Sequence, residues 1–188
     1  PYYNKPTQEG LYGHYEAIAT DVDIPIIIYN IPGRSIVDMS VETMARLARL
    51  PNIVGVKDAT NDLARPLATR TVIGPDFCQL SGEDATVAAF LAQGGHGCIS
   101  VTSNVAPRLC ARLHEAWRRQ DMDDFTATRD RLMPLHAALF CESSPGPVKY
   151  AASLLDKCAP ETRMPMAPIA AASRARVETA MRDVGLLN

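Results

Sequence analysis

Residues 52–60 read NIVGVKDAT, and this short run decides how the rest of the chain is interpreted. Ile53 to Val56 shows no alternation of polar and apolar residues, which is typical of a strand covered on both faces in a parallel sheet. Lys57 follows at the end of that strand. Burial disfavours a charged ammonium, so a lysine at this place needs a charged partner, water or a chemical role. The stretch therefore predicts a buried parallel strand that ends at a lysine of special interest.

Three further apolar runs resemble this one and alternate with segments of helical character. The runs are 24–29, 77–80 and 97–101, and the expected helices span 7–20, 40–50, 62–71 and 84–93. Ser40 is a typical N-cap, and Gly94 and Gly95 are a usual stop signal. Strands that alternate with helices in this way predict successive βα units and a parallel sheet.

The pattern changes after Val101, where all further segments look helical. The expected helices are 107–120, 122–140, 147–155 and 168–184. We therefore predict two parts, a βα part over residues 1–119 and a helical extension over residues 120–188.

Composition excludes several classes of protein. The net charge of -2 gives no basic field for nucleic acid or an anionic membrane, and no apolar run approaches the roughly 20 residues that span a bilayer. The five cysteines are scattered and odd in number, which favours a reduced, cytoplasmic setting. The four histidines lack ligand spacing, so we expect no metal. The chain opens at Pro1 without a methionine, as a fragment would.

Side chains at the carboxyl ends of parallel strands meet at one edge of the sheet, where functional groups gather. Tyr29 and Lys57 come at the ends of neighbouring predicted strands. A lysine supplies an amine nucleophile and a tyrosine supplies a phenolic proton, a combination that suits Schiff-base chemistry. Two structural alternatives remain open: Lys57 extends to solvent and pairs with Asp58, and Tyr29 is a core tyrosine with a satisfied hydroxyl.

Two other places carry candidate binding residues. Arg34 lies in a turn-prone loop and could hold a carboxylate with both arms of its guanidinium, or it is a solvated loop arginine. Tyr2 and Tyr3 form an aromatic pair on a short extended segment before a helix. Such a pair marks an interface, or it packs on the neighbouring helix.

Several motifs together resemble the dihydrodipicolinate synthase family, within the class I aldolase group that also includes N-acetylneuraminate lyase. The motifs are 1–12 (PYYNKPTQEGLY), 29–34 (YNIPGR), 55–60 (GVKDAT), 80–84 (LSGED), 94–101 (GGHGCISV), 131–135 (RLMPL) and 165–168 (PMAP). The likeness runs in order along essentially the whole chain. It implies an α/β fold of the (β/α)8 TIM-barrel type, of which this chain would hold about the last four βα units and a C-terminal helical extension.

The resemblance also implies roles for the reacting residues. Lys57 would form a Schiff base with pyruvate, and Tyr29 would donate and accept protons beside it. Tyr3 is similar to the tyrosine of a proton relay that crosses a dimer interface, and Tyr2 matches a position in the pocket of the inhibitor L-lysine at that interface.

Three further positions would hold the substrates. Arg34 resembles the arginine that binds the carboxylate of the second substrate, whereas Gly82 and Ile99 resemble residues around the pyruvate. The arginine in this loop favours the synthase branch over the sialate lyase branch.

The implied activity is the condensation of pyruvate with L-aspartate 4-semialdehyde to 4-hydroxy-tetrahydrodipicolinate, a step of lysine and diaminopimelate biosynthesis. The resemblance implies no metal or organic cofactor, a homo-oligomer built as a dimer of dimers (a homotetramer), and feedback by L-lysine. The family's Thr-Thr segment, which would bind the pyruvate carboxylate, is expected upstream of Pro1, so we expect this chain alone to be weakly active. Two alternatives stay open: a pyruvate-dependent aldolase for sialate or a 2-keto-3-deoxy sugar acid, and a non-catalytic half-barrel.

Overall fold

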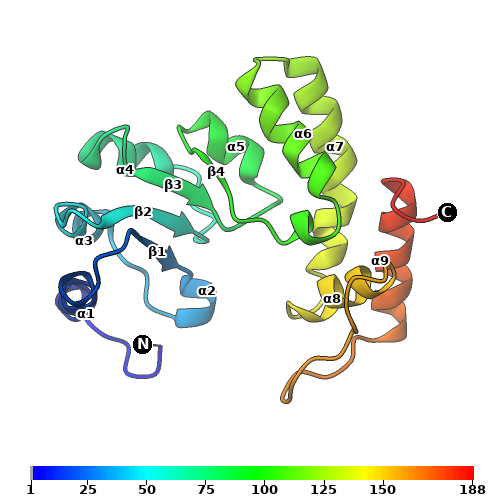
Figure 1. Cartoon of the computed structure of the whole chain (residues 1–188), viewed down its shortest axis with the longest axis horizontal. Helices are drawn as coiled ribbons and strands as arrows, with labels where there is room; N and C mark the ends of the chain where they lie inside the picture. Colours follow the sequence, from blue (N-terminus) through cyan, green and yellow to red (C-terminus); the bar gives the residue numbers. More distant parts are fainter. Residues whose placement is uncertain (1) are drawn as a thin grey trace. The chain divides into compact units, whose positions relative to one another are not determined.

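The computed structural model describes residues 2–188; Pro1, the first residue of the aromatic segment, lies outside the described residues. The chain forms two compact units, residues 1–99 and residues 100–188 (Figure 1). The first unit contains a parallel sheet with helices between its strands, and the second is helical.

The sheet of the first unit has four parallel strands in the order β1-β2-β3-β4, so each strand lies beside its neighbour in sequence. The strands are β1 (Ile26–Asn30), β2 (Ile53–Asp58), β3 (Cys78–Ser81) and β4 (Gly97–Cys98). The helices are α1 (Gln8–Asp21), α2 (Pro32–Ser35), α3 (Val41–Leu47), α4 (Arg65–Ile73) and α5 (Val87–Ala92) (Figure 1). The predicted βα alternation is therefore confirmed, with ends that differ by a few residues.

The helix ends follow from local chemistry. The Thr7 hydroxyl accepts a hydrogen bond from the Gly10 N–H at 3.2 Å, and the Ser40 hydroxyl accepts one from the Thr43 N–H at 3.2 Å. These bonds satisfy donors that the first turn of α1 and of α3 would leave unpaired. Gly94, which follows α5, has a φ of +92°, a conformation that L side chains rarely adopt. The predicted stop signal therefore lies where the helix does end.

The core of this unit lies between one face of the sheet and helices α1 and α3. Ile28 of β1 is 1% exposed and packs in a cluster with Leu11 of α1 and Leu47 of α3. Burying one such side chain stabilises the fold by about 1.5–3 kcal/mol. The opposite face is open in the described chain, since Ile27 is 42% and Tyr29 46% exposed. Within residues 2–188 the helices pack only on the Ile28 side, so the cover of the second face stays a prediction.

Two local predictions need correction. Arg34 lies in the short helix α2 and not in an irregular loop, because Pro32 at the start of that helix has the fixed φ that a first turn requires. The fourth strand ends at Cys98, so Ile99 follows the strand, and a 3-10 turn (η1, Thr102–Asn104) comes soon after it.

The second unit is built from η1 and four helices. These are α6 (Pro107–Arg118), α7 (Met122–Leu139), α8 (Gly146–Ser153) and α9 (Ala171–Asp183). Helix α7 contacts α6, α8 and α9, and buries Leu132, Leu135 and Leu139 completely. A buried hydrogen bond of 2.7 Å joins the Thr102 hydroxyl to Nδ1 of His136. No helix in residues 2–188 is long and apolar enough to cross a membrane.

The compact units divide at residues 99 and 100, whereas the predicted boundary between barrel and helical extension lies at 119 and 120. The difference arises because α6 packs along α7 and so joins the helical unit. The predicted boundary counts α6 as part of the barrel. Whether α6 belongs to the barrel of the protein stays a prediction.

Candidate active site

Strand register brings the two predicted reacting residues together. Tyr29 of β1 and Lys57 of β2 are partners in the parallel ladder, and both side chains point to the open face of the sheet. Nζ of Lys57 lies 3.9 Å from the centroid of the Tyr29 ring. At this distance the negative face of the ring attracts the ammonium. The amine is therefore held at the carboxyl edge of the sheet, beside a phenol.

One structural alternative for Lys57 is wrong. Asp58 does not pair with Lys57, because successive side chains of a strand point to opposite faces. Asp58 is 9% exposed and faces the helices, where its Oδ2 lies 2.9 Å from Nε of Arg65. The Lys57 amine thus faces the open side without a carboxylate from its own strand end.

Gly82 lies directly after β3 and against the Lys57 side chain. Its N–H donates to the Asp58 carbonyl at 2.6 Å, which brings the two backbones together. A Cβ at Gly82 would lie 2.8 Å from Cβ of Ala59 and 3.3 Å from Cε of Lys57. Glycine therefore leaves the space in which the lysine side chain lies.

Ile99 continues the strand edge beyond β4. Its N–H donates to the Ser81 carbonyl at 2.9 Å, so Ile99 lies beside the end of β3, next to Gly82. Its side chain is 45% exposed and adds apolar surface at this edge. Lys57, Tyr29, Gly82 and Ile99 thus belong to the ends of four adjacent strands.

Arg34 lies after β1, on α2, and its side chain is exposed. The segment closes in a strained turn centred on Ile36, which has a φ of 69° and a ψ of -43°. The Val37 N–H donates to the Ser35 carbonyl at 2.8 Å across this turn. These features define a classic γ-turn, which is rare for a β-branched residue. The turn directs the chain back toward the sheet within a few residues of Arg34.

Glu83 is a charged residue of this edge that had no role in the sequence-based prediction. Burial raises the pKa of Glu83 and the neighbouring Asp84 raises it further, whereas the positive charges of Lys57 and Arg34 lower it. The Glu83 carboxylate is therefore near enough to Lys57 and Arg34 to feel the charge of both. The sequence signal was its position directly after Gly82, at a strand end.

Tyr2 and Tyr3 are not brought into this group of residues. Tyr2 is 64% and Tyr3 84% exposed, and Tyr3 lies in a turn rather than in an extended segment. Neither ring takes part in a ring contact, hydrogen bond or ion pair within residues 2–188. Packing on the following helix does not account for them, so the interface interpretation stays a prediction.

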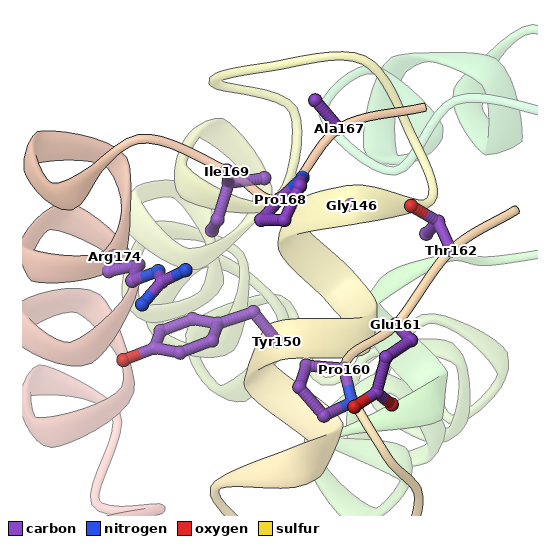
Figure 2. Close-up of a pocket in the computed structure, with 9 residues that line it drawn as sticks. All are labelled: Gly146, Tyr150, Pro160, Glu161, Thr162, Ala167, Pro168, Ile169 and Arg174. Carbon is purple, nitrogen blue, oxygen red and sulfur yellow. The ribbon is translucent and has the colours of Figure 1, made fainter. Parts of the chain in front are cut away.

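A pocket of about 200 Å³ lies in the helical unit, between α8, α9 and the segment that joins them (Figure 2). Figure 2 shows the Tyr150 ring between Arg174 and Pro160, and the Arg174 guanidinium carbon lies 5.5 Å from the ring centroid. The Tyr150 hydroxyl donates to Glu178 at 2.7 Å. The pocket wall in the described chain carries no amine, thiol or imidazole and none of the predicted site residues. The predicted reacting residues Lys57 and Tyr29 lie instead at the strand ends of the first unit.

The described residues 2–188 contain no group of three or more His, Cys, Asp or Glu side chains arranged to hold a metal ion. The chemical groups at the strand ends are an amine, a phenol, a guanidinium and a carboxylate, contributed by Lys57, Tyr29, Arg34 and Glu83. Such a set can attack a carbonyl, move protons and bind an anionic substrate.

Known proteins match this chain over its whole length. The model of the dihydrodipicolinate synthetase family matches residues 1–184. The 4-hydroxy-tetrahydrodipicolinate synthase of Rhodospirillum centenum is 71% identical over 187 residues, which cover all of this chain and 64% of that protein. The chain therefore spans slightly less than two thirds of the length of this relative.

Solved structures agree with this match. The chloride-inhibited dihydrodipicolinate synthase from Acinetobacter baumannii, complexed with pyruvate, is 42% identical with a TM-score of 0.94 over all of this chain and 64% of its own. The lysine-bound enzyme from Cyanidioschyzon merolae is 37% identical with a TM-score of 0.96 over the same shares. These neighbours confirm the predicted α/β fold of the TIM-barrel type, here with four βα units and a helical extension. By the family model, the relatives and the fold, this chain belongs to the dihydrodipicolinate synthetase family.

Proposed function

We propose that the protein condenses pyruvate with L-aspartate 4-semialdehyde to 4-hydroxy-tetrahydrodipicolinate, through a Schiff base on Lys57. The observation that carries the proposal is the 3.9 Å approach of Nζ of Lys57 to the Tyr29 ring, at matched strand ends. A relative that is 71% identical and a related structure that contains pyruvate support the same substrate. Their names favour the semialdehyde over a sugar acid as the acceptor.

The proposed reaction needs only side chains. The neutral amine of Lys57 adds to the ketone carbon of pyruvate, and loss of water gives an iminium ion. Loss of a methyl proton gives an enamine, with Tyr29 and Tyr3 moving protons. The enamine carbon attacks the aldehyde of the second substrate, whose amino group then displaces Lys57 and closes the ring. The iminium accepts the electron pair, so no metal or organic cofactor is required.

The remaining predicted residues have binding roles in this proposal. Arg34 binds the carboxylate of the semialdehyde through charge-assisted hydrogen bonds. Gly82 and Ile99 shape the space around pyruvate, next to the Lys57 side chain.

The exposed Tyr2 and Tyr3 belong to an interface between subunits of a cytoplasmic homotetramer in this proposal. Aromatic residues are enriched at such interfaces, since they bury a large area. Tyr3 reaches the partner's site, and Tyr2 lines a pocket for L-lysine as a feedback inhibitor. The lysine-bound relative supports the inhibitor.

Trapping with borohydride tests the central step. The full protein is incubated with labelled pyruvate and reduced, which makes an imine adduct permanent. We expect Lys57→Ala to abolish the label. Lys157→Ala is the matched control, because Lys157 is an exposed lysine of the helical unit, and it should label like the wild type. Label on the Lys57→Ala protein would overturn the proposal.

A polypeptide of residues 1–188 by itself should be weakly active. Its first unit exposes apolar side chains on the open sheet face and beside the edge strand β1, as at Ile27 and Ile24. Such an edge invites pairing with other chains. We expect turnover far below that of the full protein and association that rises with concentration. Turnover equal to that of the full protein would contradict this.

A further inference from the structure

Arg65 has a buried side chain that binds three groups at once. It is the first residue of α4 and is 9% exposed. Its Nε lies 2.9 Å from Oδ2 of Asp58, and its Nη1 lies 3.0 Å from Oδ2 of Asp38. Its Nη2 donates to the Met39 carbonyl. A planar guanidinium suits this arrangement, since its donors point in fixed directions.

The first of these groups is the direct neighbour of the proposed nucleophile. Asp58 follows Lys57 at the end of β2. Its other oxygen, Oδ1, accepts hydrogen bonds from the Thr60 N–H at 2.9 Å and the Thr60 hydroxyl at 2.6 Å. Because Asp58 is bound on both oxygens, its backbone position is fixed, and so is that of Lys57.

The second group connects Arg65 to the other side of the site. Oδ1 of Asp38 accepts from the side-chain amide of Asn30 at 2.7 Å, and Asn30 follows Tyr29 at the end of β1. The side-chain oxygen of Asn30, Oδ1, accepts a hydrogen bond from the Met39 N–H at 3.2 Å. These bonds close the segment 31–39, which carries Arg34, onto the end of β1.

Alternation along the strands keeps this network away from substrate. Tyr29 and Lys57 point to the open face, whereas Asn30 and Asp58 are buried on the helix side. Arg65 therefore acts on the site through its neighbours and touches no reacting group.

We infer that Arg65 is a positioning residue: its guanidinium sets the placement of Lys57, Tyr29 and the Arg34 segment relative to one another. The inference rests on the proposed function, which gives those three residues their roles. A lysine at position 65 keeps the charge but loses the planar fork, so it cannot hold both carboxylates and the Met39 carbonyl together. Misplacement of a reacting group by about 1 Å can cost about a hundredfold in rate.

The test compares Arg65→Lys with Arg46→Lys in the full protein. Arg46 is the matched control, because it binds Glu9 through both terminal nitrogens, at 2.7 and 3.1 Å, but on the exposed surface between α1 and α3. Pyruvate trapping in a single turnover and the steady-state kcat and KM for the semialdehyde are measured well below the melting temperature. We expect Arg65→Lys to lower the trapping rate about tenfold or more and to raise that KM. Arg46→Lys should stay within about twofold of the wild type.

Asp38→Asn separates the two arms of the network. Asp38 is half exposed, so the variant should fold, yet an Asn amide has a single acceptor oxygen and cannot accept from both Nη1 of Arg65 and Nδ2 of Asn30. We expect a higher KM for the semialdehyde, because the segment 31–39 that carries Arg34 is no longer held. The trapping rate should be nearly unchanged, because the bond from Arg65 to Asp58 beside Lys57 remains. Kinetics of folded Arg65→Lys that equal those of Arg46→Lys, with only a lower melting temperature, would overturn the inference. Absence of trapping in the wild type would instead overturn the proposed function.

Discussion

Gly82 and Lys57 lie so close that a single methyl group on the glycine would reach the lysine side chain. The ideal Cβ position at Gly82 is 3.3 Å from Cε of Lys57, and on its other side 2.8 Å from Cβ of Ala59. The second distance is shorter than real Cβ atoms allow, so a side chain here must displace a neighbour. Cβ of Ala59 is fixed to the main chain, so the backbone at Gly82 or Ala59 must shift, and the Lys57 side chain, which the new methyl group also contacts, shifts with it.

Gly82→Ala should therefore lower the rate of pyruvate trapping by about tenfold, through displacement of the Lys57 amine. The measurement is single-turnover trapping at several pyruvate concentrations. Gly13→Ala is the control, since Gly13 lies in α1 with nothing within 4 Å of its Cβ position. That change should leave trapping unaltered and stabilise the protein by about 1 kcal/mol, the difference in helix propensity. An unchanged trapping rate in Gly82→Ala would show that the space beside Lys57 is not critical.

Tyr29→Phe separates the ring from the hydroxyl. The variant keeps an aromatic face for the Lys57 ammonium, which lies 3.9 Å from the ring centroid, but loses the phenolic proton. We expect imine formation to persist while turnover falls by about 10²–10⁴-fold, the usual contribution of a general acid or base. Single-turnover borohydride trapping gives the rate of imine formation, and a steady-state assay gives the rate of turnover. Equal losses in both would assign the defect to binding and not to proton transfer.

Glu83→Gln should change stability in a pH-dependent way. Burial raises the pKa of Glu83 above its ordinary value of 4.5, so the folded state holds the proton more tightly than the unfolded chain. Ionisation therefore costs stability as the pH rises through the folded pKa, and no cost exists below the unfolded pKa. The glutamine variant lacks this cost. In urea unfolding, its advantage over the wild type should grow as the pH rises above the ordinary value of 4.5 and level off once the pH exceeds the raised pKa of Glu83 in the folded state.

Glu9→Gln supplies a comparison of opposite sign. The hydrogen bond from Arg46 lowers the pKa of Glu9, so this carboxylate stabilises the folded state above its unfolded pKa, and the benefit is lost as the pH falls. The glutamine variant should therefore lose stability relative to wild type at pH 7 and not at low pH. The same trend in both variants would contradict the assignment for Glu83.

Ile36→Gly should stabilise the protein by about 1 kcal/mol. Ile36 has a φ of 69° in its γ-turn, and strain of this kind costs about 1–3 kcal/mol. Glycine removes the strain but loses more conformational entropy on folding, which reduces the gain by about 0.5–1 kcal/mol. The side chain is 59% exposed, so little packing is lost. Chemical unfolding measures the change. Ile36→Val keeps the branched Cβ and should bring no gain; equal gains in both variants would mean that strain is not the cause.

The βα alternation was predictable from the sequence because apolar runs and caps are local signals. Ser40 caps the start of α3, and Gly94 follows the end of α5. The pairing of Tyr29 with Lys57 was expected from the parallel order alone, since parallel strands align their carboxyl ends. The motif resemblance to the family was likewise carried by local residues, and the family match confirms it.

Other features depend on contacts between distant residues and gave no local signal. Arg65 looks like an ordinary residue at a helix start, and its bonds to Asp38 and Asp58 join three separate segments. Which face of the sheet the helices of this chain cover was not predictable, because an apolar run does not indicate the side on which a helix packs. Glu83 was passed over because its pKa is set by burial and by charges that include Lys57 on β2 and Arg34 on α2.

Two adjacent residues of β2 face opposite sides of the sheet. Lys57 points to the open face, whereas Asp58 points to the helices and binds Arg65. A deletion of one residue within this strand would exchange them. The carboxylate would then enter the substrate side, and the amine would be driven into the helix side against Arg65, so one missing codon would both remove the nucleophile and place two like charges together. Length is therefore constrained in β2 more strictly than residue identity at its apolar positions.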